Sequence, residues 1–341
     1  MRPSRLLPIT AASAALALGL VGCASGSGAE TGGATGDTVT IEHALGTVEV
    51  PANPERVATV AWANHEVPLA LGVVPVGMAA ANFGDDDGDG LLPWVSEKLE
   101  ELGAETPVLF DETDGIDFEA VADTDPDVIL AGYSGLTQED YDTLSEIAPV
   151  VAYPEGPWAT SWRELIEINA AGIGRADEGE QLIADIEAEI AEAAAEHPEL
   201  EGKTAGFITH IDPTDLSEIS YYTTADPRPA FFEDLGLVEP AGIAAASEEA
   251  GDDVFSLTQS AEQADFFDDV DIVVTYGTDL LTTLQADPLL SQIPAVQRES
   301  FVQLDGTGPL GTAANPTPLA ISWVLDDYLE LLAEAAAKVD Q

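Results

Sequence analysis

Cysteine is almost absent from this sequence of 341 residues, which contains Cys23 and no other. We therefore expect neither disulfide bonds nor a cysteine-ligated metal site in the folded part of the chain. Signatures of catalysis are also missing, since no G-x-S-x-G turn, Walker loop or clear Ser/His/Asp set occurs. The four histidines are too scattered for a convincing metal cluster. These absences argue against an enzyme and predict no resident metal or cofactor.

Positive charge is scarce as well. The chain has 10 Lys and Arg against 64 Asp and Glu, and its formal net charge is −54. The acidic residues are spread along the sequence rather than gathered in one tail, which is typical of a solvated acidic surface. Such a surface repels nucleic acid and anionic lipid, so we expect neither as a binding partner.

The N-terminal segment predicts where the protein works. Residues 1–23 begin with Arg2 and Arg5 and continue as a short apolar stretch, which indicates an export signal rather than a membrane span. The stretch ends in Leu20-Val21-Gly22-Cys23, which is similar to a lipoprotein box and implies that Cys23 is lipidated. Residues 24–37 are rich in Gly, Ser, Ala and Thr and predict a flexible linker. We expect a protein held by lipid at the extracytoplasmic face of the cell membrane.

One pattern occurs twice in the remaining sequence. In each copy a glutamate opens a short amphipathic run, an aspartate follows eight or nine positions later, and an apolar run then leads to a tyrosine. These residues are Glu119, Asp127 and Tyr133 in the first copy, and Glu262, Asp271 and Tyr276 in the second. The apolar runs suit strands that are buried on both faces of a parallel sheet. The duplication predicts two α/β lobes of similar plan.

Strand signals alternate with helical ones on either side of a long acidic, alanine-rich run. This alternation predicts an α/β fold with two Rossmann-like lobes of parallel strands, a long bridging helix and a ligand cleft between the lobes. Gly172 and Gly174 weaken the helix and leave two outcomes open, a kink or a division. We expect an N-terminal lobe over 38–158, the bridging helix over 159–198 and a C-terminal lobe over 199–341. The strand signals are at 57–62, 74–78, 108–110, 128–130, 150–152, 205–210, 272–276 and 301–304.

Large polar-tipped rings lie at the carboxyl ends of the predicted strands, which is where open α/β sheets bind ligands. An aromatic cleft with few polar anchors suits a bulky small molecule. The candidate ligand-binding residues are Trp62, Tyr133, Trp158, His210, Tyr222, Arg228 and Tyr276.

An acidic stretch over 85–90 contains D-x-D-x-D-G, the opening of a calcium loop. The twelfth position, however, is Ser96, the glutamate comes one position later at Glu97, and no helix precedes the motif. We interpret the stretch as a solvated acidic turn, with a calcium-stabilised surface module as the alternative.

Several segments together resemble the iron-siderophore class of solute-binding proteins that serve ABC importers. Their order and spacing carry the resemblance, which covers essentially all of the chain beyond the signal. The segments are Pro51-x-x-Pro54-x-Arg56-Val57, Leu69-Ala70-Leu71-Gly72-Val73-x-Pro75-Val76-Gly77, Phe118-Glu119 with Asp125-Pro126-Asp127-Val128-Ile129, Ser161-Trp162-Arg163-Glu164, and Ala261-Glu262.

The resemblance implies a shallow cleft between two lobes, capture of a ferric siderophore and its delivery to the permease dimer of an ABC importer, with no catalytic step. It also implies that Glu119 and Glu262 pair with arginines of the permease. Iron would enter only as the chelate, and we expect the receptor to be a monomer.

The ligand's charge follows from the shortage of basic residues. Apart from Arg2 and Arg5, eight Lys and Arg remain, and only Arg163 and Arg228 are expected near the cleft. An acidic field favours a neutral or cationic ferric hydroxamate over an anionic catecholate complex. Arg228 would donate hydrogen bonds to the chelate's oxygens. The alternatives are haem or a corrinoid, a bare metal ion bound through His65 and His210, or an anchored enzyme.

Overall fold

The first of two five-stranded sheets is entirely parallel, as the buried apolar runs predict. The computed structural model describes residues 37–209, 211–251, 254–277 and 279–340, which all belong to one compact unit. In spatial order the strands are β5 (Val108–Phe110), β4 (Gly77–Ala79), β3 (Val57–Thr59), β6 (Val128–Ala131) and β7 (Val150–Ala152). The helices of this half are α1 (Glu66–Ala70), α2 (Pro93–Leu102), α3 (Phe118–Asp123) and α4 (Gln138–Ser145).

An antiparallel hairpin, β1 (Thr38–His43) and β2 (Gly46–Pro51), precedes the first sheet and contacts β7. No strand was expected over these residues. Its core-facing side consists of few apolar residues, of which Ile41 and Val50 are buried. A hairpin with so short an apolar face leaves a weak signal in the sequence.

The second sheet repeats the plan of the first with one difference. In spatial order its strands are β10 (Ser256–Ser260), β9 (Glu218–Tyr222), β8 (Ala205–Ile208), β11 (Ile272–Tyr276) and β12 (Phe301–Leu304). The strands β8, β11 and β12 are parallel, whereas β9 runs antiparallel to both of its neighbours, β8 and β10. The helical elements of this half are α7 (Pro227–Asp234), α8 (Ala241–Ala250), η2 (Ala261–Phe267), α9 (Leu280–Ala286), η3 (Leu290–Gln292), α10 (Pro294–Arg298) and α11 (Pro309–Ala313).

The duplicated sequence pattern is a duplicated topology. Strands β6 and β11, which follow Glu119 and Glu262, occupy the same position in their sheets, beside the central strands β3 and β8. The repeated aspartate has a structural function in both copies. Asp127 accepts hydrogen bonds from the backbone N–H groups of Glu55 and Arg56, and Asp271 accepts one from Thr204. Each aspartate thereby connects the start of its strand to the start of the neighbouring parallel strand.

The acidic run that follows the first sheet forms two helices, α5 (Trp162–Gly172) and α6 (Ala176–Ala194), followed by the short η1 (Pro198–Leu200). The chain thus divides rather than kinks, and Gly174 explains why. Its φ is +71°, and a Cβ atom there would lie 1.8 Å from the carbonyl oxygen of Ala52, so only glycine fits. Helix α5 begins with a capping box between Ser161 and Glu164.

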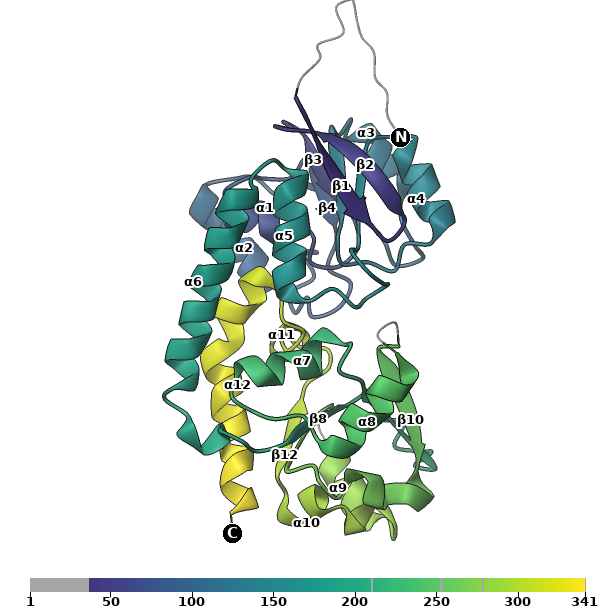
Figure 1. Cartoon of the computed structure of the whole chain (residues 1–341), viewed down its shortest axis with the longest axis vertical. Coiled ribbons are helices and arrows are strands. Elements are labelled where there is room, and N and C mark those ends of the chain that lie inside the picture. The colour runs from purple at the N-terminus through teal and green to yellow at the C-terminus, as the bar shows by residue number, and fades with distance from the viewer. Residues whose placement is uncertain (1–36, 210, 252–253, 278, 341) are drawn as a thin grey trace, which may run out of the picture. The chain divides into compact units, whose positions relative to one another are not determined.

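Helix α12 (Pro318–Val339) packs against α6 along much of its length, as Figure 1 shows. It also contacts α1 and α2 of the first half and β11 and β12 of the second. Its buried face, including Leu325 and Tyr328, joins the largest hydrophobic core cluster, which contains residues of both halves. We propose the boundaries 38–158, 159–198 and 199–341 for the lobes and bridge, with α12 shared between the lobes.

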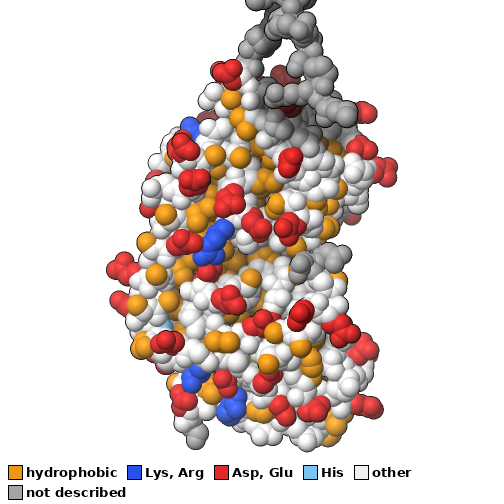
Figure 2. All heavy atoms as spheres, in the orientation of Figure 1, with side chains coloured by type: hydrophobic (Ala, Val, Ile, Leu, Met, Phe, Trp, Pro, Cys, Tyr) orange, Lys and Arg blue, Asp and Glu red, His pale blue; other side chains and the backbone are white. Residues whose placement is uncertain are grey.

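Acidic side chains are scattered over the face seen in Figure 2, and few basic ones interrupt them. Within the described part of the chain, no helix combines the length and the apolar composition needed to cross a bilayer.

Candidate functional site

A cavity of about 370 Å³ is lined by residues from both halves of the protein. Six of the seven candidate ligand-binding residues line it, and the seventh, His210, lies outside the described residues. The cavity is lined by Trp62, Asn82, Phe83, Tyr133, Trp158, Tyr222, Asp226, Arg228, Phe255, Tyr276, Thr312 and Asn315. Residues far apart in the sequence therefore meet at the carboxyl ends of the parallel strands, as the fold class predicts.

Trp62 projects from a turn with an unusual backbone. The residues on either side of it, Ala61 and Ala63, have φ angles of +58° and +61°, which residues other than glycine seldom adopt. The side chain of Asn64 stabilises this turn, because its Nδ2 donates to the carbonyl oxygens of Val60 (2.8 Å) and Trp62 (3.1 Å). Backbone strain of this kind clusters at functional sites.

Asn64 also joins this turn to the end of β6. It is fully buried, its Nδ2 donates to the carbonyl oxygen of Tyr133 (2.9 Å), and its Oδ1 accepts from the N–H of Tyr133 (3.0 Å) and from Asn169 (3.0 Å). One amide thus holds Trp62 and Tyr133 at fixed positions on the cavity wall. No local pattern in the sequence marks Asn64, because its contact with Tyr133 joins a turn to the end of a distant strand.

Tyr133 and Trp158 form an edge-to-face pair, with ring centroids 5.4 Å apart and planes at 83°. Trp158 has a φ of +59°, and its N–H donates to the carbonyl oxygen of Ser134. A Cβ atom at Gly135 would lie 2.4 Å from the indole nitrogen of Trp158. Burial, and next the negative charge of Asp226, raises the pKa of Tyr133 to about 12, so its hydroxyl stays protonated at neutral pH.

Arg228 is the basic residue of the cavity, and Asp226 neutralises it. The Nε and Nη2 atoms of Arg228 donate to the two carboxylate oxygens of Asp226 at 2.9 and 3.0 Å. Burial alone would lower the pKa of Arg228, but the negative charge of Asp226 more than offsets this and the pKa rises. Asp226 also caps α7 by accepting the N–H of Arg228, a position that the Asp-Pro sequence could have indicated.

The tyrosines of the second half surround this ion pair. The guanidinium of Arg228 lies over the ring of Tyr222, 3.9 Å from its centroid, and donates to the Tyr222 hydroxyl at 3.0 Å. Phe207 supports both Tyr222 and Tyr276 from beneath, with centroid distances of 5.5 and 5.1 Å. The cavity therefore offers aromatic faces and an arginine, with no net charge from its one ion pair.

Arg163, which the sequence analysis placed near the cleft, does not line the cavity. It forms ion pairs with Asp234 (2.8 Å) and Glu187 (2.7 Å), and its guanidinium stacks on Trp162. The sequence did not indicate these ion pairs, because Asp234 lies 71 positions away on α7 and Glu187 lies 24 positions away on α6. Asp234 also accepts the indole N–H of Trp162, so the pair joins α5 to α7.

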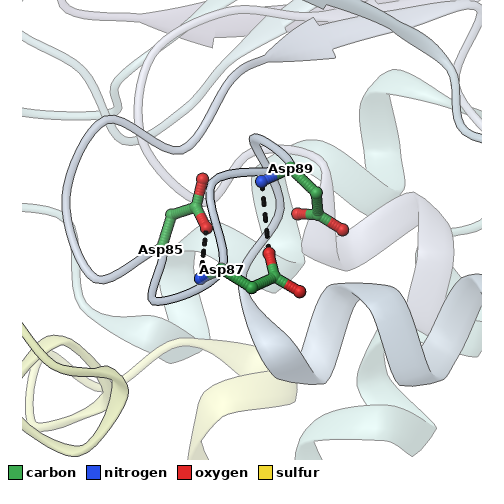
Figure 3. Close-up of side chains that lie close together, drawn as sticks. All are labelled: Asp85, Asp87 and Asp89. Carbon is green, nitrogen blue, oxygen red and sulfur yellow. Dashed lines mark hydrogen bonds between the residues drawn. The ribbon is translucent and has the colours of Figure 1, made fainter.

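The acidic stretch is a tight turn. One carboxylate oxygen from each of Asp85, Asp87 and Asp89 lies within 4.8 Å of the others (Figure 3). These carboxylates already accept backbone N–H groups of the turn, and Asp85 alone accepts those of Asp87, Gly88 and Gly90. Among the described residues this is the one group of three or more His, Cys, Asp or Glu with the spacing of a metal site.

Glu119 and Glu262 are both exposed, and each lies in the first turn of a helical element. Asp117 caps α3, and Ser260 caps η2. Their equivalent positions follow from the duplicated topology.

His43 and His65 are buried, and burial lowers the pKa of both side chains, that of His65 to about 4.

The protein has two α/β lobes, and residues of both line an aromatic cavity. This arrangement is that of a two-lobed solute-binding protein. The chain belongs to the periplasmic binding protein family, whose sequence pattern matches residues 57–307.

Proteins that are similar to this chain in sequence or structure support the same class. The chain is 43% identical to PiaA of Streptococcus pneumoniae TIGR4, solved in complex with ferrichrome, with a TM-score of 0.83 over 88% of this chain and 99% of that one. It is 28% identical over 244 residues to a probable siderophore-binding lipoprotein, YfiY, of Bacillus subtilis strain 168, covering 71% of this chain and 70% of the relative. Staphylococcus aureus SirA, complexed with staphyloferrin B, shares the fold at 19% identity, with a TM-score of 0.65 over 86% of this chain and 98% of SirA.

Proposed function

We propose that this protein is the receptor of an iron-uptake ABC importer and binds a ferric hydroxamate siderophore in the cavity between its lobes. The observation that carries the proposal is the aromatic cavity whose arginine is paired with a carboxylate. PiaA, at 43% identity, was solved with ferrichrome, a ferric hydroxamate. In this proposal the protein captures and presents the chelate and has no catalytic role, and iron is the cargo rather than a cofactor.

The charge of the cavity supports a hydroxamate. A catecholate complex of iron is strongly anionic and needs several unpaired cations to offset its desolvation. Here Arg228 is paired with Asp226, no other Lys or Arg among the described residues lines the cavity, and the whole chain is strongly acidic. A neutral or cationic chelate avoids this cost. Aromatic rings supply contact area, and the outer N–H groups of Arg228 can donate to the chelate's oxygens.

Tryptophan fluorescence tests the ligand class, because Trp62 and Trp158 line the cavity. The protein is titrated with a ferric trihydroxamate, a ferric tricatecholate, haem, cobalamin and ferric citrate. We expect saturable quenching by the trihydroxamate at micromolar affinity or better. Trp158→Phe should reduce the amplitude of quenching, whereas Trp323→Phe, on α12, is the control. A response to haem, cobalamin or the tricatecholate alone would overturn the hydroxamate assignment.

We also propose that the receptor is a lipid-anchored monomer on the extracytoplasmic face of the membrane. Cys23 lies outside the described residues, so the support comes from the sequence of the signal and from the lipoprotein relative. Replacement of Cys23 by serine should release the protein from the membrane fraction of cells that express it. Retention of Cys23→Ser in that fraction would contradict lipid anchoring through this residue.

The acidic turn at 85–90 offers the alternative of a calcium-stabilised module. A ligand that binds the folded state raises the melting temperature. We expect the melting temperature to be the same in calcium and in a calcium chelator, because the backbone of the turn already satisfies the carboxylates. A rise of several degrees in calcium would favour the alternative.

A further inference from the structure

A second cavity, of about 360 Å³, lies in the first half of the protein. Trp62, Asn82 and Trp158 line both this cavity and the one described above, so the two share a wall. The remaining wall includes His65 and Glu112, together with small apolar residues from the ends of β3 and β4. A ligand held between the lobes is therefore adjacent to a second space that it could extend into.

Three buried polar atoms without partners belong to residues that line this second cavity. They are the indole nitrogen of Trp62, the Nδ1 atom of His65 and the Oε1 atom of Glu112. The other carboxylate oxygen of Glu112 accepts the N–H of Ala61 at 2.9 Å, which fixes the carboxyl group beside the strained turn that carries Trp62. Buried polar groups are nearly always hydrogen-bonded, so three unpaired atoms at one cavity indicate a missing partner.

The charges at the cavity favour a cation. In the part of the chain that the structure describes, no Lys or Arg lines it, and burial keeps His65 neutral by lowering its pKa to about 4. The carboxylate of Asp140 also lies at the cavity, where its Oδ2 atom accepts the backbone N–H and hydroxyl of Thr137 in the capping box of α4. Glu112 is the carboxylate of this cavity that has a buried oxygen without a partner, and the faces of Trp62 and Trp158 attract cations as well.

We propose that this cavity is a second subsite of the receptor, in which the carboxylate of Glu112 binds the protonated amine of an arm that extends from a ferric hydroxamate. The inference rests on the proposed function and narrows it, because it selects chelates with a cationic arm over neutral chelates with the same iron centre.

Two chelates test this subsite. One is a linear ferric trihydroxamate that ends in a primary amine, and the other is its N-acetylated derivative, which has the same iron centre without the positive charge. For the unmodified protein at pH 8, where Glu112 with its pKa of about 7 is mostly ionised, titration should give an affinity about tenfold or more higher for the amine. A charged hydrogen bond in a buried site requires a difference of this size. Equal affinities would overturn the subsite and leave the hydroxamate receptor standing.

Variants assign the preference to Glu112. In Glu112→Gln, which keeps an acceptor for the N–H of Ala61, the ratio of the two affinities should fall towards one. Asp114→Asn removes the same charge from an exposed position in the same loop, and the ratio should persist. A ratio that survives Glu112→Gln, or that is lost equally in Asp114→Asn, would show a general field effect and overturn the subsite. If neither chelate bound, the hydroxamate assignment would fail and the subsite with it.

Discussion

The buried carboxylate of Glu66 accepts the backbone N–H of Leu319 at 2.9 Å, across 253 positions of the sequence. Leu319 lies in the first turn of α12, and the second carboxylate oxygen of Glu66 accepts the indole N–H of Trp94 at 2.7 Å. Glu66 therefore connects α1, α2 and the N-terminus of α12, where a negative charge is favoured by the helix dipole. Burial raises the pKa of this carboxyl, and the hydrogen bonds it accepts oppose that rise.

Replacement of Glu66 by alanine should destabilise the protein by roughly 2–5 kcal/mol, because it leaves two buried donors without an acceptor. Urea denaturation at pH 7, followed by circular dichroism, measures the change. Glu97→Ala, at an exposed position on α2, is the control and should change the free energy of unfolding by less than about 0.5 kcal/mol. A similar small change for Glu66→Ala would show that water replaces the lost carboxylate.

Glu112 should make stability depend on pH. Burial raises its pKa from 4.5 to about 7, against the opposing hydrogen bond from Ala61. Between these values the folded state binds more protons than the unfolded state, so the free energy of unfolding falls as the pH rises. Above pH 7 the ionisation of buried Glu112 lowers the free energy of unfolding by a cost of about 3 kcal/mol. Glu112→Gln removes it, and the variant should be more stable than the unmodified protein at pH 8 and equal to it near pH 4.5. Thermal unfolding across this range checks the prediction, and a pH-independent difference contradicts it.

Gly135 leaves the space that Trp158 occupies. Gly135→Ala would place a Cβ atom 2.4 Å from the Trp158 indole nitrogen and should displace the ring. We expect a loss of about 1–3 kcal/mol in stability and weaker binding of the ferric chelate. Gly156→Ala is the matched control, since no atom lies within 4 Å of a Cβ atom there. Equal chelate affinities in the two variants would argue against a role for Trp158.

The pair of Arg228 and Asp226 should show strong coupling. Arg228→Gln leaves the carboxylate of Asp226, which is 1% exposed, without its cation and should cost about 3 kcal/mol or more. The double variant Asp226→Asn with Arg228→Gln should be less destabilised than Arg228→Gln alone, because no buried charge is left unpaired. A double-mutant cycle by urea denaturation measures the coupling, and additive losses would refute it.

Glu119 and Glu262 should act in transport rather than in chelate binding. If they dock on basic residues of a permease dimer, Glu119→Gln and Glu262→Gln should each slow uptake of the ferric chelate by cells, and the double variant roughly tenfold or more. The affinity of the isolated protein for the chelate should not change. Glu139→Gln, an exposed glutamate in the first turn of α4, is the control. Uptake that is unaffected in the double variant would rule out this docking surface.

The sheets and six cavity residues could be predicted because their signals are local. Tyr133 and Tyr276 each end a buried apolar run, and parallel strands bring their carboxyl ends to one edge of a sheet. Strands β9 and β10, which lie side by side at one end of the second sheet, were not predicted. Strand β10 is only partly buried and carries Ser, Thr and Gln, so no apolar pattern marks it.

What the sequence did not reveal depends on long-range contacts. Asn64 matters because it contacts Tyr133, 69 positions away. It does so from a turn in which Ala61 and Ala63 have positive φ angles, and alanine in a sequence does not predict such a turn. Arg163 was expected near the cleft, but Asp234, 71 positions away, holds it elsewhere. Neither relationship leaves a trace in the neighbouring residues.

The contact between Glu66 and Leu319 also bears on the order of folding. Closing a loop of 253 residues costs about 5 kcal/mol of chain entropy before any contact repays it. Each sheet can form from strands that are closer in sequence. The core that α12 shares with both lobes can form only after this loop has closed. The cavity between the lobes is therefore assembled late, and a chain that has folded only one half has no complete site for a ferric chelate.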